Sequence, residues 1–287
     1  MRYTTRNLLR KAKDPCGKHI MSLIVEPLET PDWERFASNQ AQPDLNLFPV
    51  QDPNKAISFA HHGEILQGVF EDNDGRYHSG LITMPCPLFR STAKFIPGRI
   101  PKIACNVPSK WKAIKAAELI FEKFALEAMP YQGGELILES DIPLSWGLGS
   151  STCDVITSID AVSRSLGFNL ERTQVAKLAV EAEIASDSTM FTHEVVLFAQ
   201  REGIILNKYH GSLPHLSVLG FNSCPELSGI DTLAMKKIDY DQREKKILRQ
   251  LLETFESAIN TQDPSLLAKV STESAIINQR HIPKPLF

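Results

Sequence analysis

The chain has 287 residues, of which 43% are hydrophobic, and a formal net charge of -3, values that describe a globular protein of one large domain or two smaller ones. The charge excludes the strongly basic balance of a nucleic-acid binder, and no run of about eighteen apolar residues could cross a membrane. Five scattered cysteines without a CxxC pair favour neither a disulfide framework nor a zinc site, so we expect a reducing cytoplasm.

Residues 1–55 differ in composition from the residues that follow. They are rich in Pro, Asn, Gln and Asp and lack sustained periodicity, so we interpret them as an N-terminal extension. The stretch HIMSLIVEP within them is strand-like. The basic start leaves an amphipathic targeting peptide or membrane-surface helix as the alternative.

Two strand-like runs follow, over 56–70 and 78–96, with DNDG at 72–75 between them as a hairpin signal. A helix is predicted over 109–129, with Ser109 as its cap and an apolar stripe that faces the core. The stripe consists of Trp111, Ile114, Ala117, Phe121 and Phe124.

A half-buried strand over 134–143 leads into a glycine-containing loop and then a helix over 151–167. A further helix is expected over 170–183, and strand-like runs cover 194–200, 203–209 and 216–222. Two helices then close the chain. The first is 242–260, capped by Asp241, and the second is 265–279, opened by Asp263 and Pro264. This order predicts an α+β protein.

The loop IPLSWGLGSSTCD at 142–154 joins a strand to a helix and is not a Walker A motif. Gly147 and Gly149 would let the backbone approach an anion, and the free N–H groups of the helix that follows would face it. On spacing alone, a simple strand-to-helix turn is the competing interpretation. The pattern closely resembles the phosphate-binding motif of the GHMP kinases. Ser145 of this chain stands where many members of that family have another glycine. The resemblance implies ATP binding by Pro143, Trp146, Gly147, Leu148, Gly149, Ser150 and Ser151.

Upstream, FAHHGEILQG resembles the first motif of the same family, which lines the acceptor pocket. The matching residues are Gly63 and Glu64, which the resemblance implies as substrate-binding. His61 and His62 are interpreted as neighbours of the pocket wall, because adjacent residues on a strand point to opposite faces.

The third match is EAEIASDSTMF at 181–191. The resemblance implies that Asp187 binds the substrate and is the catalytic base, and that Glu183 holds magnesium together with Ser151. Glu181 is the alternative to Glu183, and Ser150 the alternative to Ser151. A turn capped by Asp187 is the purely structural interpretation. A base near the acceptor and a metal at the phosphates are what phosphoryl transfer needs.

Together HGEILQG, SSTCD and SDSTMF resemble the L-threonine kinases of cobalamin biosynthesis, which implies ATP and Mg²⁺ as cofactors and a small-molecule hydroxyl acceptor. The implied fold has a ribosomal protein S5 domain 2-like ATP-binding domain over 56–195. A ferredoxin-like domain over 196–287 completes it. We expect this domain to be shortened, because we find no third, C-terminal glycine motif. A homodimer or the N-terminal extension could cover the missing part. Another hydroxy amino acid or small alcohol as acceptor, or a binding protein without catalysis, are the alternatives.

Overall fold

The computed structural model describes residues 8–13, 19–24, 55–124, 130–218, 220 and 238–283, the first two ranges by their backbone only. In one compact unit, β1 (Leu8–Lys13) pairs antiparallel with β2 (His19–Ile24), in agreement with the strand-like HIMSLIVEP. Every other helix and strand belongs to a second unit, which contains all the predicted site residues.

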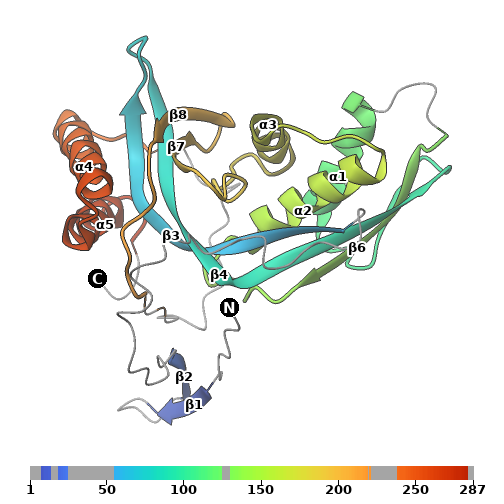
Figure 1. Cartoon of the computed structure of the whole chain (residues 1–287), viewed down its shortest axis with the longest axis horizontal. Helices are drawn as coiled ribbons and strands as arrows, with labels where there is room; N and C mark the ends of the chain where they lie inside the picture. Colours follow the sequence, from blue (N-terminus) through green and yellow to red (C-terminus); the bar gives the residue numbers. More distant parts are fainter. Residues whose placement is uncertain are drawn as a thin grey trace, which may run out of the picture. The chain divides into compact units, whose positions relative to one another are not determined.

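A long antiparallel hairpin organises this second unit (Figure 1). The two predicted runs are its strands, β3 (Lys55–Glu71) and β4 (Tyr77–Gly98). The DNDG turn joins them with Gly75 in the left-handed region at φ 78°. The pairing shifts register after Phe59, between His61 and Glu64, and again before Leu66. Such bulges bend a strand and redirect its side chains.

Further strands extend the sheet along two separate stretches of β4. Near its end, β4 pairs with β6 (Gly133–Ser140), and β6 pairs in parallel with β5 (Ile103–Cys105). Near its start, β4 meets β7 (Val195–Ala199), which forms a hairpin with β8 (Ile204–Tyr209). The REG turn predicted between the last two strands is therefore present.

Three helices cover one part of the sheet: α1 (Trp111–Phe124), α2 (Ser150–Ser165) and α3 (Arg172–Glu183). Helix α2 packs against both α1 and α3 as well as against β3 and β4. It is consequently buried on all sides from Thr152 to Ser163, polar residues included.

The predicted core stripe of α1 is wrong at Trp111, whose surface is 51% exposed. The buried positions are Ala113, Ala116, Ala117, Leu119 and Ile120, because small alanines let α1 approach its neighbours closely.

The N-cap of α1 also differs from the prediction. The N–H of Ile114 donates to the carbonyl of Lys110, which places Lys110 rather than Ser109 at the N-cap position.

Helices α4 (Gln242–Thr261) and α5 (Pro264–Gln279) pack against β3 and form a second core (Figure 1). Both begin where predicted: Asp241 forms a capping box with Glu244, and Asp263 caps α5 ahead of Pro264.

The two cores use opposite faces of β7. Val196 and Phe198 point to the core of α1–α3, and Leu197 points to the core of α4 and α5.

The strand predicted over 216–222 is not formed at residues 216–218 and 220, and its other positions lie outside the described residues. None of the helices in the described ranges combines the length and the apolar character that a membrane span requires.

Candidate active site at the glycine loop

The loop that leads from β6 into α2 has three residues in the left-handed region, namely Ser145, Gly147 and Gly149, with φ of 66°, 71° and 73°. Ser145 therefore adopts the backbone that a glycine would take most easily. Gly149 is the N-cap of α2, and no side chain caps this helix. Its first-turn N–H groups remain available to an anion, as the loop motif predicts.

A close approach by His61 requires glycine at position 149. A Cβ atom at that position would lie 2.3 Å from Cδ2 and 2.5 Å from Nε2 of the His61 ring. The backbone N–H of His61 also donates to the carbonyl of Leu148 at 3.2 Å. The loop is thus fixed to β3 at the bulge, while Trp146 and Gly147 are exposed.

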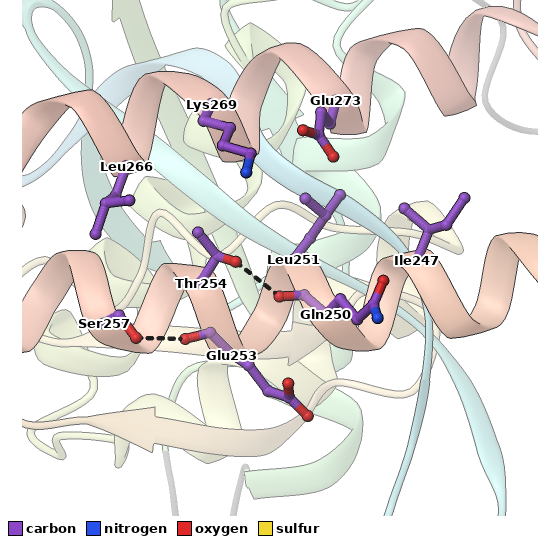
Figure 2. A pocket seen from close by; sticks show the side chains of 9 residues that line it. All are labelled: Ile247, Gln250, Leu251, Glu253, Thr254, Ser257, Leu266, Lys269 and Glu273. Carbon is purple, nitrogen blue, oxygen red and sulfur yellow. Dashed lines mark hydrogen bonds between the residues drawn. The ribbon is translucent and has the colours of Figure 1, made fainter.

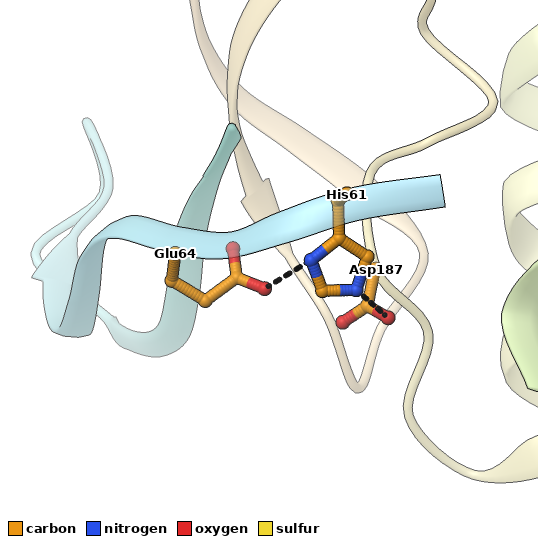
Figure 3. A group of neighbouring side chains, drawn as sticks. All are labelled: His61, Glu64 and Asp187. Carbon is orange, nitrogen blue, oxygen red and sulfur yellow. Dashed lines mark hydrogen bonds and ion pairs between the residues drawn. The ribbon is translucent and has the colours of Figure 1, made fainter. Parts of the chain in front are cut away.

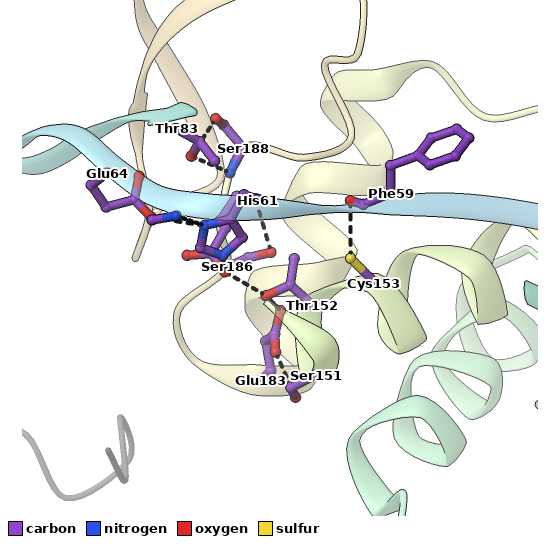
Figure 4. A network of polar contacts seen from close by, with 12 residues as sticks. Phe59, His61, Glu64, Thr83, Ser151, Thr152, Cys153, Glu183, Ser186 and Ser188 are labelled. Atoms are coloured by element: carbon purple, nitrogen blue, oxygen red, sulfur yellow. Dashed lines mark hydrogen bonds and ion pairs between the residues drawn. The ribbon is translucent and has the colours of Figure 1, made fainter. Parts of the chain in front are cut away.

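Ser151 and Glu183 lie together at the start of α2 (Figure 4). The hydroxyl of Ser151 donates to Oε2 of Glu183 at 3.1 Å, and that of Thr152 lies 2.9 Å from Oε1. Glu183 is buried. Its burial and the charge of Asp187 raise its pKa to about 7. A proton or a bound cation is therefore favoured at this carboxyl group.

The two alternatives left open by the sequence take different positions. Glu181 is exposed and pairs with Lys123, with 2.8 Å between Oε2 and Nζ. Ser150 is half-buried and makes none of the described hydrogen bonds to Glu183, whereas Ser151 makes one. The geometry favours Glu183 with Ser151 as the pair of oxygen ligands.

Asp187 lies beyond the end of α3 and contacts His61 of β3 (Figure 3). Its Oδ2 atom is 2.9 Å from Nε2 of His61 and 3.3 Å from the hydroxyl of Thr152. Burial raises the pKa of Asp187, but the nearby His61 outweighs it and lowers the pKa below its usual value. Asp187 is therefore ionised at neutral pH and able to accept a proton.

The His61 ring is held at both nitrogens. The N–H of Gly63 donates to Nδ1 at 2.9 Å, and Nε2 faces Asp187. Burial lowers the pKa of His61, but Asp187 and Glu64 together outweigh this effect and raise it to about 9. The Gly63 hydrogen bond favours the neutral ring, whereas the two carboxylates favour the cation. In either state Nε2 carries a proton, and this N–H donates a hydrogen bond to Asp187.

Glu64, the residue matched to the acceptor pocket, lies on the other side of His61. Its Oε1 is 3.6 Å from Nδ1, and its side chain is 15% exposed. Burial raises its pKa to about 7, with Asp187 acting in the same direction and His61 against it. Glu64 therefore changes protonation near neutral pH and can accept or donate a hydrogen bond to a polar substrate.

The sequence analysis assigned no role in the site to three residues beside Glu183 and Asp187. His61 was interpreted only as a neighbour of the pocket wall, although it contacts Asp187. Thr152 bridges Glu183 and Asp187, and the charge of Lys112 on α1 lowers the pKa of both carboxyl groups. Thr152 lies in the first turn of a helix whose residues are mostly buried. A buried polar side chain needs a hydrogen-bond partner, and this was the available signal for Thr152.

Two sets of residues could hold a cation. Ser151 and Glu183 offer oxygen atoms, the ligands that Mg²⁺ prefers, and they fit that ion. His61, Glu64 and Asp187 also offer ligand atoms within 4.8 Å of one another. Both nitrogens of His61 are already engaged, so metal binding there would break the hydrogen bonds of the ring. The first set is the better magnesium site.

A separate groove runs between α4 and α5 (Figure 2). Its walls include Ile247, Leu251 and Leu266, with the charged Lys269 and Glu273. None of the residues that line this groove was singled out in the sequence, and none of them is Glu64, Glu183 or Asp187.

The chain resembles known proteins in sequence and in fold. The family model described as the GHMP kinases N terminal domain matches residues 112–194, which include the loop, α2 and Asp187. The L-threonine kinase of Salmonella typhimurium strain LT2 is 30% identical, over 52% of this chain and 49% of that protein. The 4-diphosphocytidyl-2-C-methyl-D-erythritol kinase of Nitrosomonas europaea is 31% identical, over 31% of each chain.

Among solved structures, a mevalonate diphosphate decarboxylase from Legionella pneumophila has a TM-score of 0.54 at 11% identity. The match covers 79% of this chain and 76% of that one, and it shows a shared fold. The chain aligns with about half the length of the L-threonine kinases that it matches.

Proposed function

Because the chain belongs to the GHMP kinase superfamily, we propose that it transfers the γ-phosphoryl group of ATP to the hydroxyl of a small molecule, with L-threonine as the acceptor. The observation that carries the proposal is the meeting of Ser151, Glu183 and Asp187 at the uncapped start of α2. Ser151, Thr152 and Glu183 form one polar network (Figure 4). Asp187 adjoins it through Thr152, so a phosphate site, a carboxylate for a metal and an ionised base would lie side by side.

ATP would place its phosphates on the backbone of Gly147–Ser151. The free N–H groups of the first turn of α2 and the positive end of the helix dipole favour the negative charge. Trp146, which is 37% exposed, would lie beside the nucleotide. The left-handed glycines leave no Cβ atom in the way of the phosphates.

Ser151 and Glu183 would hold Mg²⁺, which neutralises the phosphate charge when it is bound. Glu183 must be ionised for this role, and the cation itself would favour the ionised form against the effect of burial. Lys112 is close enough to lower the pKa of Glu183 and adds a further positive charge.

Asp187 would be the general base for the acceptor hydroxyl, and Glu64 with Gly63 would bind the rest of the acceptor. The low pKa of Asp187 keeps it ionised at neutral pH. An acceptor that carries an ammonium group, as L-threonine does, would favour the ionised form of Glu64 against the effect of its burial. We extend the proposal to the domain division, with 56–195 binding ATP and a ferredoxin-like 196–287 completing the site.

The test is ATP consumption by the purified chain with Mg²⁺ over a panel of L-threonine, L-serine, homoserine and small alcohols. We expect turnover with L-threonine that is lost in Asp187→Asn. Turnover with another acceptor would replace the substrate and keep the reaction class. No turnover with any acceptor, together with ATP binding that weakens in Gly149→Ala, would leave a nucleotide-binding protein without catalysis.

A further inference from the structure

The two oxygen atoms of Asp187 have different surroundings. Among the described residues, Oδ2 receives a hydrogen bond from Nε2 of His61 at 2.9 Å, and it lies 3.3 Å from the hydroxyl of Thr152. The single proton of that hydroxyl goes either to Oδ2 or to Oε1 of Glu183, which is 2.9 Å away. Oδ1 has neither of the two contacts of Oδ2. The side chain as a whole is 27% exposed, so one oxygen is held and the carboxyl group still reaches solvent.

His61 is itself fixed in place by four contacts. Its backbone N–H donates to Leu148, its ring lies against Gly149, and its Nδ1 accepts from Gly63. The fourth contact is the hydrogen bond to Asp187. The ring is nearly completely buried, with 5% of the side chain exposed. A donor locked in this way fixes the orientation of its acceptor.

We propose that His61 is a positioning residue, which together with Thr152 holds Oδ2 of Asp187 so that Oδ1 alone faces the acceptor hydroxyl. The inference rests on the proposed function and adds a division of labour between the two oxygens. It also assigns a role to the bulge in β3, because the shift in register beside His61 determines which of two adjacent histidines turns toward Asp187.

In the step that this geometry serves, the hydroxyl O–H bond of the acceptor breaks and its proton moves to Oδ1 of Asp187. The hydroxyl oxygen forms a bond to the γ-phosphorus of ATP. The bond between the γ-phosphorus and the bridging oxygen breaks, and ADP leaves with that electron pair. His61 transfers no proton in this step and keeps its hydrogen bond to Oδ2.

The experiment measures kcat and KM for L-threonine and for ATP in His61→Leu, His61→Gln and Thr152→Val. Leucine removes the donor, whereas the amide of glutamine can donate from about the position of Nε2. We expect His61→Leu to lower kcat about 30-fold with KM for ATP nearly unchanged, because a misplaced base costs rate. His61→Gln should recover at least about a third of the wild-type kcat, and Thr152→Val should lower kcat about 5-fold.

The matched control is His78→Gln, which removes another histidine between two carboxylates on the same hairpin and should leave kcat unchanged. Equal kcat in His61→Leu and His61→Gln, or loss of ATP affinity with unchanged kcat, would overturn the inference, since the ring would then only support Gly149. If His61→Leu fails to fold, a wild-type kcat in Thr152→Val would overturn it. No turnover by the wild type would overturn the proposed function and this inference together.

Discussion

The β3–β4 hairpin carries two histidines that each lie between two carboxylates, and the two sites differ in almost everything else. His61 lies at the bulge between Glu64 and Asp187. His78 lies near the turn, with Nε2 at 2.8 Å from Asp72 and Nδ1 at 2.5 Å from Glu202. At His78 the carboxylates come from the β3–β4 and β7–β8 turns, so this cluster ties two turns together.

The difference between them lies in the surroundings rather than in the ion pairs. Glu202 is 43% exposed, whereas Glu64 is 15% exposed and its burial raises its pKa. The His61 cluster also adjoins a left-handed glycine loop and the uncapped start of a helix. Charged clusters of similar composition can thus differ in burial and in what lies next to them, and on this difference we base the proposal that the His61 cluster belongs to the active site.

The largest expected effect is on the rate, and it should separate the two clusters completely. Asp187→Asn removes the base while keeping the shape of the side chain, so we expect kcat to fall on the order of 1000-fold. Glu202→Gln makes the same change at the His78 cluster and should leave kcat within about 2-fold of the wild type. Steady-state assays of ATP consumption with L-threonine measure both.

A smaller rate loss in Asp187→Asn than about 10-fold would mean that another group takes the proton or that none is needed. A comparable loss in Glu202→Gln would mean that the two clusters do not differ in the way described. ATP binding by both variants should match the wild type, because neither residue is proposed to touch the nucleotide.

The second prediction compares two glycines with almost the same backbone. Gly149 and Gly75 have φ of 73° and 78°, so alanine at either one costs about 1 kcal/mol for the left-handed conformation. At Gly149 the added Cβ also meets the His61 ring at 2.3 Å, whereas at Gly75 its nearest neighbour is 3.7 Å away. We expect Gly149→Ala to weaken ATP binding at least about 10-fold, because the loop must shift.

Gly75→Ala is the control and should lower the melting temperature without changing ATP affinity. Isothermal titration with ATP and thermal unfolding of both variants give the two readouts. Equal ATP affinity in Gly149→Ala and in the wild type would contradict the assignment of this loop to the phosphates.

A third prediction concerns the metal. Ser151→Ala removes one of two proposed oxygen ligands and the hydrogen bond to Glu183. We expect the Mg²⁺ concentration for half-maximal rate to rise about 10-fold. Ser165→Ala, at the other end of α2, removes a hydroxyl whose one hydrogen bond within the described residues goes to the backbone carbonyl of Val162, and it should leave the Mg²⁺ dependence unchanged. A similar metal dependence in both variants would exclude Ser151 as a ligand.

The helices with capping signals were predictable from the sequence, and the packing of α1 was not. Asp241 and Asp263 mark the starts of α4 and α5 by side-chain hydrogen bonds that involve only local residues. The core face of α1 depends on how closely α2 approaches. Alanine scores as weakly apolar in a periodicity pattern, so Trp111 was favoured over the alanines that the packing buries.

The motifs predicted the candidate loop and the carboxylates of the proposed site, but not the residues that support these carboxylates. Glu183 and Asp187 belong to a contiguous stretch, whereas the contact between His61 and Asp187 joins residues 126 positions apart. Alternation along an ideal strand predicts only that His61 and His62 face opposite ways. The bulges in β3 decide the rest, and they depend on the pairing with β4.

The smallest effect is expected at His78, where the prediction concerns stability and pH. Burial lowers the pKa of His78, but its hydrogen bonds to Asp72 and Glu202 outweigh this and raise the pKa above 6.5 in the folded state. A raised pKa stabilises the fold fully below the unfolded value of about 6.5, and this contribution disappears as the pH rises through the folded value.

His78→Gln should therefore lower the free energy of unfolding at pH 6 by at most about 1 kcal/mol, because the ion pairs of partly exposed carboxylates are weak. At a pH well above the folded pKa the wild type has lost the charge as well, so the difference between the two proteins should shrink. Urea unfolding of both at the two pH values measures it. A difference that stays constant with pH would mean that His78 acts through its shape and neutral hydrogen bonds alone, and the charge would then matter only at His61.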